Sequence, residues 1–260
     1  MIKNWLKRFV PMPARSLNDR LDLIEKREIE IKKLLESNLR NIAETNWANI
    51  YNSTIEGTDW LKSRSFSPGR WAIGYQYLYV LYRILNEFHP SNILDLGLGQ
   101  SSWMIAQYAA SDDSVSHTIV EHDQNWIDFF VEGHQLPENT KIIQLDLAFT
   151  NYKETVVREY GGFFETFVGK KFDLISIDGP LGADMPIYAR IDILKMIPDI
   201  LPDDFIILID DSQRSGEKNT IEDMKNVLIK NDIPFAVGVY SGNKEITIIC
   251  SEHLHFLTSM

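Results

Sequence analysis

From residue 92 onward, short apolar runs alternate with segments of helical periodicity, and this alternation restricts the possible folds more than any other feature. Strands that are separated by helices pair in parallel, because the helix carries the chain back to the same edge of the sheet. The sequence therefore predicts a doubly wound α/β sheet with helices on both faces. The predicted strands are 92–96, 117–121, 141–145, 172–177, 205–209, 235–240 and 246–250, and the predicted helices are 102–110, 125–132, 152–160, 190–200 and 219–230.

The last two apolar runs must be connected differently. Only residues 241–245 separate them, which is too few for a crossover helix. The two runs are therefore predicted to form an antiparallel hairpin. We expect a seven-stranded, Rossmann-like sheet that is mostly parallel and ends in an antiparallel C-terminal pair.

The N-terminal part has a different character. Residues 16–39 are rich in Glu, Lys, Leu and Ile and contain no Gly or Pro, which predicts a helix. Its apolar stripe could pair with a second copy, giving a homodimer, or pack on the chain's own core, and Glu28 interrupts the heptad pattern. Glycine, serine and proline punctuate residues 46–69, which predicts a loop-rich connection, and a helix is expected over 71–88.

This change of pattern divides the chain. Residues 1–66 are expected to be an N-terminal helical extension and connector, and residues 67–260 the main domain. Residues 1–10 mix bulky apolar and basic side chains but lack the apolar core and cleavage site of a secretory signal. Weak peripheral contact with a membrane and a frayed or partner-packed terminus are the two alternatives for that segment.

Composition excludes several classes of function. A formal net charge of −11 opposes general binding to nucleic acid, which depends on clustered Lys and Arg. Cys250 is the single cysteine, so neither a disulfide framework nor a cysteine-based zinc cluster can form, and a cytoplasmic location is expected. The longest charge-free apolar-rich stretch, 71–82, is shorter than the roughly 18–20 residues of a transmembrane helix.

A strand, a glycine turn and a helix follow one another between Ile93 and Ser102. Gly97 and Gly99 permit positive φ and the close approach of a ligand, and the following helix presents free N–H groups. Ser102 stands where the dinucleotide fingerprint has its third glycine. Asp95 suits the cationic amino group of an amino-acid ligand better than a polyphosphate, although an Asp that caps the turn is the structural alternative.

The acidic-x-Gly-x-Gly pattern resembles the first motif of the class I S-adenosylmethionine-dependent methyltransferases. Glu121 ends the second predicted strand, about 20 residues past the turn, where ribose hydroxyls would lie in this family and in NAD enzymes. The resemblance implies that His122 and Asp123 flank the adenosyl group and that Asp146, after the third strand, contacts adenine, with capping as the alternative for Asp146. The implied cofactor-binding residues are Asp95, Gly97, Gly99, Ser101, Ser102, Glu121, His122 and Asp146.

Three carboxylates follow the next two strands. Asp178 comes after the fourth predicted strand, and Asp210 and Asp211 come after the fifth, so all three should meet at the carboxyl edge of the sheet. Gathered anions need a cation, or one of them must hold a proton. A hard divalent cation with oxygen ligands satisfies this need, and helix capping or a salt bridge to Arg214 is the alternative for Asp210 and Asp211.

The same carboxylates resemble those of the metal-dependent O-methyltransferases, both the catechol type and the macrolide or aminocoumarin sugar type. This resemblance implies Mg²⁺ or another divalent cation on Asp178, Asp210 and Asp211, with Asp178 and Asp210 as catalytic residues. Those relatives carry a Lys or Asp base shortly after the fourth strand, whereas this chain has Gly179 to Gly182 there, and Asp184 is the nearest acid.

The short Asp-Gly-Pro segment is also similar to glycan-modifying methyltransferases, including the plant glucuronoxylan type. The function expected from the sequence is therefore O-methylation of a hydroxyl group on a saccharide or small polar metabolite. One alternative is an NAD-dependent oxidoreductase, which shares the glycine turn and Glu121 but predicts a parallel sixth strand reached by a crossover. The other is a nucleoside-binding module without catalysis.

Overall fold

The computed structural model describes residues 14–69 and 72–260, which fall into two units, 1–42 and 43–260. The described part of the first unit is the beginning of helix α2 (Ala14–Thr54), whose last turns belong to the second unit. The expectation of membrane contact by residues 1–10 lies outside the described residues. Within 14–69 and 72–260, no helix has the length and the apolar content that spanning a membrane requires.

The helix α2 continues past its predicted end at residue 39, so the prediction of a loop beginning at 46 was wrong up to Thr54. Residues 40–54 contain no Gly or Pro to stop a helix. Trp47 also donates from Nε1 to the carbonyl of Ser241, and Tyr51 is buried in the core. The predicted start of the next helix at residue 71 lies outside the described residues, and α3 runs over Tyr75–Glu87.

A seven-stranded sheet forms the centre of the second unit. Its strand order is β3-β2-β1-β6-β7-β9-β8, with every neighbouring pair parallel up to β7. The last strand in the sequence, β9, lies between β7 and β8 and is antiparallel to both, which confirms the predicted hairpin. The strands are β1 (Asn92–Leu96), β2 (Ser116–Glu121), β3 (Thr140–Gln144), β6 (Leu174–Ile177), β7 (Ile206–Ile209), β8 (Phe235–Ser241) and β9 (Glu245–Ser251).

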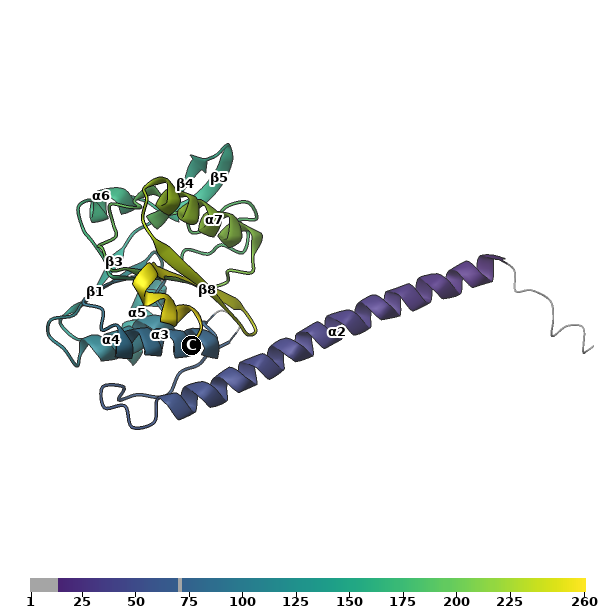
Figure 1. Ribbon diagram of the computed structural model, residues 1–260, viewed down its shortest axis with the longest axis horizontal. Helices are drawn as coiled ribbons and strands as arrows, with labels where there is room; N and C mark the ends of the chain where they lie inside the picture. The colour runs from purple at the N-terminus through teal and green to yellow at the C-terminus, as the bar shows by residue number, and fades with distance from the viewer. Residues whose placement is uncertain (1–13, 70–71) are drawn as a thin grey trace, which may run out of the picture. The chain divides into compact units, whose positions relative to one another are not determined.

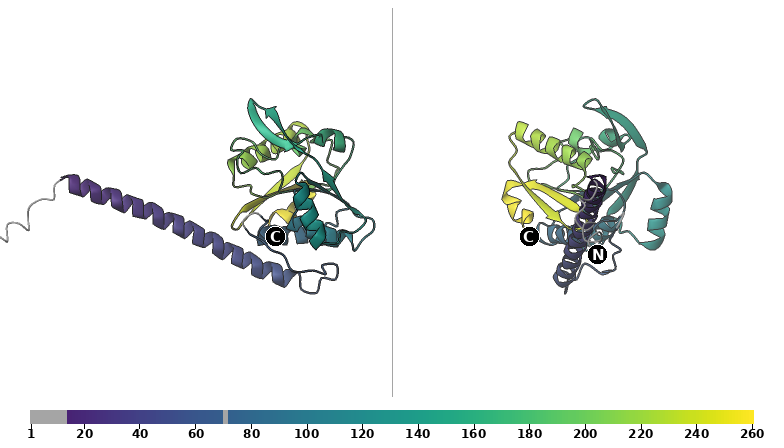
Figure 2. Two further views of the ribbon diagram at one scale, coloured as in Figure 1. Left: turned by 180° about the vertical axis from the view of Figure 1, so that it is seen from behind. Right: turned by 90° about the vertical axis from the view of Figure 1, so that its right-hand side faces the viewer.

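Helices cover both faces of the sheet (Figures 1 and 2). Successive strand residues face opposite layers, so that Leu208 packs with α3 and α4 while Ile207 and Ile209 pack with α7 and its neighbours. The central strands β6 and β7 are therefore buried at every position, as a sheet covered on both faces requires. One layer contains α3, α4 (Gln100–Ala109) and α5 (Gln124–Gly133), and the other contains α6 (Phe163–Phe167), the 3₁₀ turn η2 (Ile193–Lys195) and α7 (Ser215–Lys230).

The prediction of a helix over 152–160 was wrong. This region forms a two-stranded hairpin of β4 (Leu147–Tyr152) and β5 (Thr155–Tyr160), which Figure 1 shows above α7. Lys153 and Glu154 connect the strands with positive φ angles of 45° and 64°, the conformation of a two-residue hairpin turn. The β-branched run that begins at Thr155 then favours a strand over a helix.

The prediction of a helix over 190–200 was also wrong, because only η2 and turns form there. Arg190 has a φ of +57°, which is outside the helical region, and Pro198 lacks the N–H that a helix interior needs. Asp192 in this segment accepts a 2.7 Å hydrogen bond from the backbone N–H of Tyr160. The irregular segment is thereby fixed to the end of β5.

Asp192 supplies a test of this junction. Its side chain is buried, and burial raises its pKa to about 7, although the hydrogen bond from Tyr160 opposes the shift. The folded state therefore holds a proton that the unfolded state releases near pH 4, so stability falls as pH rises from about 4 to 7. Asp192→Asn removes this loss. At pH 8 we expect the free energy of unfolding of this variant, measured by urea denaturation, to exceed that of wild type by on the order of a few kcal/mol. At pH 4 we expect no such increase.

Asp184→Asn is the matched control. Asp184 is exposed and its pKa is lowered by the hydrogen bonds from Arg158, so its removal should not stabilise the protein at any pH. Equal responses of the two variants at pH 8 would show that Asp192 is not held as a neutral acid.

Candidate active site

Two loops that follow neighbouring parallel strands touch at Gly97 and Gly179. Gly97 follows β1 with a φ of +100°, and a Cβ added there would lie 2.9 Å from the backbone nitrogen of Gly179. A Cβ on Gly179 would in turn lie 2.8 Å from Gly97 Cα and 2.5 Å from the hydroxyl of Tyr160. Only glycine allows both loops this approach. The contact lies at β1 and β6, where the strand order reverses, which is where open α/β sheets bind ligands.

Asp95 lies beneath the glycine turn and is fully buried. Its two oxygens accept hydrogen bonds of 2.5 Å from the hydroxyls of Ser102 and Ser176, and Ser101 lies at 3.5 Å. Burial raises the pKa of Asp95 to about 6, while the serine hydroxyls oppose this shift. Ser102 Oγ also accepts from the N–H of Gly99 at 3.0 Å, so Asp95 acts on the turn through Ser102.

Glu121 lies at the end of β2 against the same turn. Its Oε2 accepts a hydrogen bond of 3.1 Å from the N–H of Leu98, and its Oε1 lies 2.7 Å from His122 Nδ1. Trp126, in the first turn of α5, donates from Nε1 to the carbonyl of Leu98 at 2.7 Å. The turn is therefore fixed from both sides, by a carboxylate and by an indole.

A cleft of about 500 Å³ opens over these groups, within the usual size range of small-molecule sites. Of the residues predicted from the sequence, those that line it are Gly97, Glu121, His122, Asp178 and Asp211. Asp95, Ser101, Ser102 and Asp210 are buried beside or beneath it, and Gly99 caps α4 next to it. Asp146 is exposed and is not part of the cleft wall, because the chain turns there into the β4–β5 hairpin.

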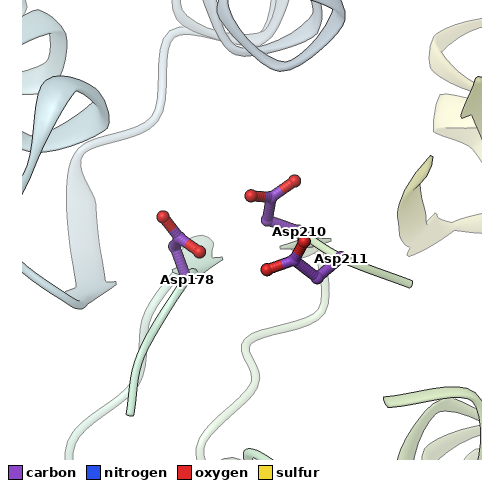
Figure 3. A group of neighbouring side chains, drawn as sticks. All are labelled: Asp178, Asp210 and Asp211. Atoms are coloured by element: carbon purple, nitrogen blue, oxygen red, sulfur yellow. The ribbon is translucent and has the colours of Figure 1, made fainter. Parts of the chain in front are cut away.

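The three predicted carboxylates do converge. Asp178 lies beyond β6, Asp210 and Asp211 lie beyond β7, and one oxygen from each lies within 4.8 Å of the others. Figure 3 shows the three side chains turned toward a common space. Burial raises the pKa of Asp178 to about 8, with a further contribution from Asp210, and burial also raises the pKa of Asp210.

Arg190 holds this cluster together, and sequence analysis did not identify it. Its side chain is only 4% exposed. Nη2 donates to Asp178 at 3.1 Å and to Asp211 at 3.3 Å, and Nη1 donates to the carbonyl of Asp210 at 2.9 Å. Nε donates to the carbonyl of Pro180. A single guanidinium thus links the loops that follow β6 and β7.

Two further cations approach from other elements. Lys244, in the turn between β8 and β9, lies 2.8 Å from Asp210 and 3.7 Å from Asp211. Burial opposes the charge on Lys244, but the neighbouring carboxylates outweigh it and raise the pKa of the lysine. Arg214 lies 2.9 Å from Asp211, so the salt bridge considered as an alternative from the sequence is present.

The carboxylates also keep capacity for a hard cation. Asp210 Oδ1 and Asp211 Oδ1 are buried and accept no hydrogen bond from the described part of the chain. Carboxylate oxygens are ligands that Mg²⁺ prefers, and these two converge with an oxygen of Asp178, so the residues fit a divalent ion. Asp184, the nearest acid in sequence, instead forms a two-fold ion pair with Arg158 and does not line the cleft.

Tyr160 is a second residue of the cleft that the sequence did not reveal. It ends β5, and because residues 152–160 were expected to be helical, its direction could not be predicted. Its hydroxyl is buried and has no hydrogen-bond partner among the described residues, although it lies beside Gly97 and Gly179. An unpaired buried hydroxyl is costly, and it lies where a bound ligand could satisfy it.

Three solved structures are similar to this chain in their overall structure. A Staphylococcus aureus protein provisionally assigned as a caffeoyl-CoA O-methyltransferase is 14% identical, with 81% of this chain and 100% of that chain covered and a TM-score of 0.51. A provisionally assigned O-methyltransferase from Klebsiella pneumoniae is 14% identical over 80% and 98%, with a TM-score of 0.48. A Bacillus cereus O-methyltransferase bound to SAH is 10% identical over 81% and 91%, with a TM-score of 0.44.

No family model matches the sequence, and no curated protein matches it. The likeness to the Staphylococcus aureus structure is therefore evidence for the fold. Together with the strand order, it shows that the chain has the Rossmann-like fold of the class I methyltransferases. The fold permits many chemistries, so the activity must be argued from the cleft.

The two glycines of the turn allow a paired test. Gly97→Ala places a Cβ against Gly179 and forces a positive φ on alanine, so we expect a loss of at least about 2 kcal/mol in unfolding free energy. Gly99 is extended at φ −173° and a Cβ there meets nothing within 4 Å, so Gly99→Ala should cost less than about 0.5 kcal/mol. Urea denaturation measures both, and equal costs would contradict the packing of the two loops.

We expect Arg190 to stabilise the carboxylate cluster. Arg190→Met leaves buried carboxylates without their shared cation, and we expect a loss of about 3–5 kcal/mol at pH 7 in urea denaturation. Arg214→Met is the control, because Arg214 also pairs with Asp211 but is 31% exposed, and it should cost about 1 kcal/mol or less. A smaller loss for Arg190→Met than for the control would show that the cluster does not depend on Arg190.

Proposed function

We propose that the protein is an S-adenosylmethionine-dependent methyltransferase that methylates a hydroxyl oxygen of a saccharide or small polar metabolite. The observation that carries the proposal is one cleft that joins two kinds of group. The glycine turn and Glu121 lie at one part of it, and the carboxylate cluster with Asp178 lies at another. A nucleoside cofactor and a hydroxyl acceptor need these two environments side by side.

The cofactor is assigned to the side of the cleft formed by the turn and Glu121. Glu121 Oε2 accepts one hydrogen bond from the described part of the chain, from Leu98, and has capacity for ribose hydroxyls. Trp126, which is 39% exposed, offers an aromatic face for adenine. The methionine part is assigned to the turn at Gly97, where the hydroxyl of Tyr160 lies and where Asp95 acts through Ser102.

The chemistry is assigned to the carboxylate cluster. Asp178 lines the cleft at the end of β6 and is the residue proposed to take the proton from the acceptor hydroxyl, with Asp210 supporting it. Lys244 and Arg190 place positive charge beside the developing alkoxide. A divalent cation would be held by Asp178, Asp210 and Asp211 and would lower the pKa of the acceptor hydroxyl.

A second hollow supports a polar acceptor. It has a volume of about 400 Å³ and shares Lys244 with the cleft. Glu44, Tyr75 and Asn243 are among its lining residues, and an aromatic ring beside carboxylate and amide groups suits the face and hydroxyls of a sugar.

The single cysteine, buried in β9, agrees with the proposal of a reducing, cytoplasmic location.

Calorimetry tests the cofactor. We expect S-adenosylhomocysteine to bind the purified full chain, and Glu121→Gln to weaken binding about ten-fold because a hydroxyl acceptor is lost. Gly99→Ala should also weaken binding while leaving stability nearly unchanged, because the open space at Gly99 is then filled. Binding of a nicotinamide dinucleotide in place of S-adenosylhomocysteine, or of neither, would sink the proposal.

Transfer is measured as formation of S-adenosylhomocysteine with a panel of saccharide acceptors. Asp178→Asn should lower the rate at least about 100-fold while the affinity for S-adenosylhomocysteine stays within a few-fold of wild type. Loss of activity in excess EDTA, restored by Mg²⁺, supports the metal, and full activity in EDTA removes the metal from the proposal. Cofactor binding without transfer to any acceptor of the panel would favour the non-catalytic module.

A further inference from the structure

Over its described residues, the first unit consists of one helix with no second element to pack on inside that unit. A lone helix cannot bury apolar side chains within itself, and most helices in proteins are stabilised by packing an apolar face. Eight large apolar residues of its described part are nevertheless each more than half exposed, and five of them share one face of the helix. These five are Leu21, Ile24, Ile31, Leu35 and Ile42.

These residues form one continuous stripe. Positions 21, 24, 28, 31, 35, 38 and 42 alternate in steps of three and four, which is the spacing of a coiled-coil seam. The pattern extends over about three heptads, and Leu34 and Leu39 widen it on either side, whereas Leu23 and Ile29 lie off it. We call Leu21, Ile24, Glu28, Ile31, Leu35, Asn38 and Ile42 the seam of α2.

The charge of the helix favours a second copy as the partner. Residues 21–42 contain five acidic and five basic residues and are therefore neutral, whereas the whole chain has a net charge of −11. Helices that lie on anionic membranes are rich in Lys and Arg on their polar face, which this one is not. Two copies of an acidic protein repel each other least where each is neutral.

The flanking charges also favour one orientation. In a parallel pair, Glu28 lies against Glu28 of the other copy, and Arg27 lies against Lys32, so both contacts are repulsive. These two repulsions outweigh the one attraction, between Arg20 and Glu25. In an antiparallel pair centred between residues 29 and 30, Glu25 faces Lys32 of the second copy twice. Lys32 then also lies beside Glu28 of the second copy, so the acid in the seam gains a partner.

We infer that α2 pairs antiparallel with α2 of a second copy of this chain through its seam. In this pair, Ile24 packs on Leu35 of the second copy and Ile31 packs on Glu28. The inference does not depend on the proposed function, because it uses only α2.

Light scattering and sedimentation of the full chain provide the first measurement. We expect twice the 30.0 kDa mass of the chain, and dissociation to monomers on Ile24→Glu. Lys33→Glu, away from the seam, is the control and should remain dimeric. Lys32→Glu should weaken the dimer several-fold, and adding Glu25→Lys should restore it. A monomeric wild type, or a dimer that Lys32→Glu strengthens as a parallel pair predicts, would overturn the inference.

Disulfide cross-linking tests the orientation independently, because the native Cys250 is buried and should not form a cross-link. On mild oxidation, the double variant Ile24→Cys, Leu35→Cys should form a covalent dimer, and the single variant Ile24→Cys should not. A covalent dimer from the single variant means that residue 24 meets residue 24 in a parallel pair, which contradicts the proposal.

Discussion

The mutual repulsion of acids at the ends of β6 and β7 is the constraint on which the cleft depends. Asp178 and Asp211 end neighbouring parallel strands, so the sheet itself brings them together. Arg190 makes this arrangement tolerable, because one buried guanidinium donates to both carboxylates and to the carbonyl of Asp210. The left-handed backbone at Arg190 and the junction through Asp192 place that guanidinium, so an irregular segment, rather than a helix, supports the site.

The sheet could be predicted because its central strands are buried on both faces and are mainly apolar, a signal that short runs keep even without alternation. The glycine turn could be predicted for a related reason. Gly97 stands at a position where a side chain would strike Gly179, and the acid at Glu121 falls at a strand end that topology brings to the same place. Local sequence and global arrangement agree at these positions.

Arg190 and Lys244 could not be predicted, because each reaches the cluster from a segment without periodicity. Nothing in the sequence near Lys244 shows that the turn between β8 and β9 lies above Asp210. The β4–β5 hairpin was missed since the length of residues 152–160 also suits a helix between two strands, and only the turn at Lys153 and Glu154 decides otherwise. The helix expected there also left Tyr160 out of the cleft, whereas Asp146 was expected in it because it follows the third strand, and it is not among the lining residues.

The position of β9 between β7 and β8 has a consequence for how the protein is made. A nascent chain can pair strands from β1 to β7 as they leave the ribosome, but β8 has no neighbour until β9 follows it and inserts. Until then, the edge of β7 is open and Lys244 is not yet above Asp210. The sheet is thus completed and the charge of the cleft balanced in the same late step of biosynthesis. A chain whose translation stops before β9 has both an unpaired strand edge that can aggregate and an incomplete site.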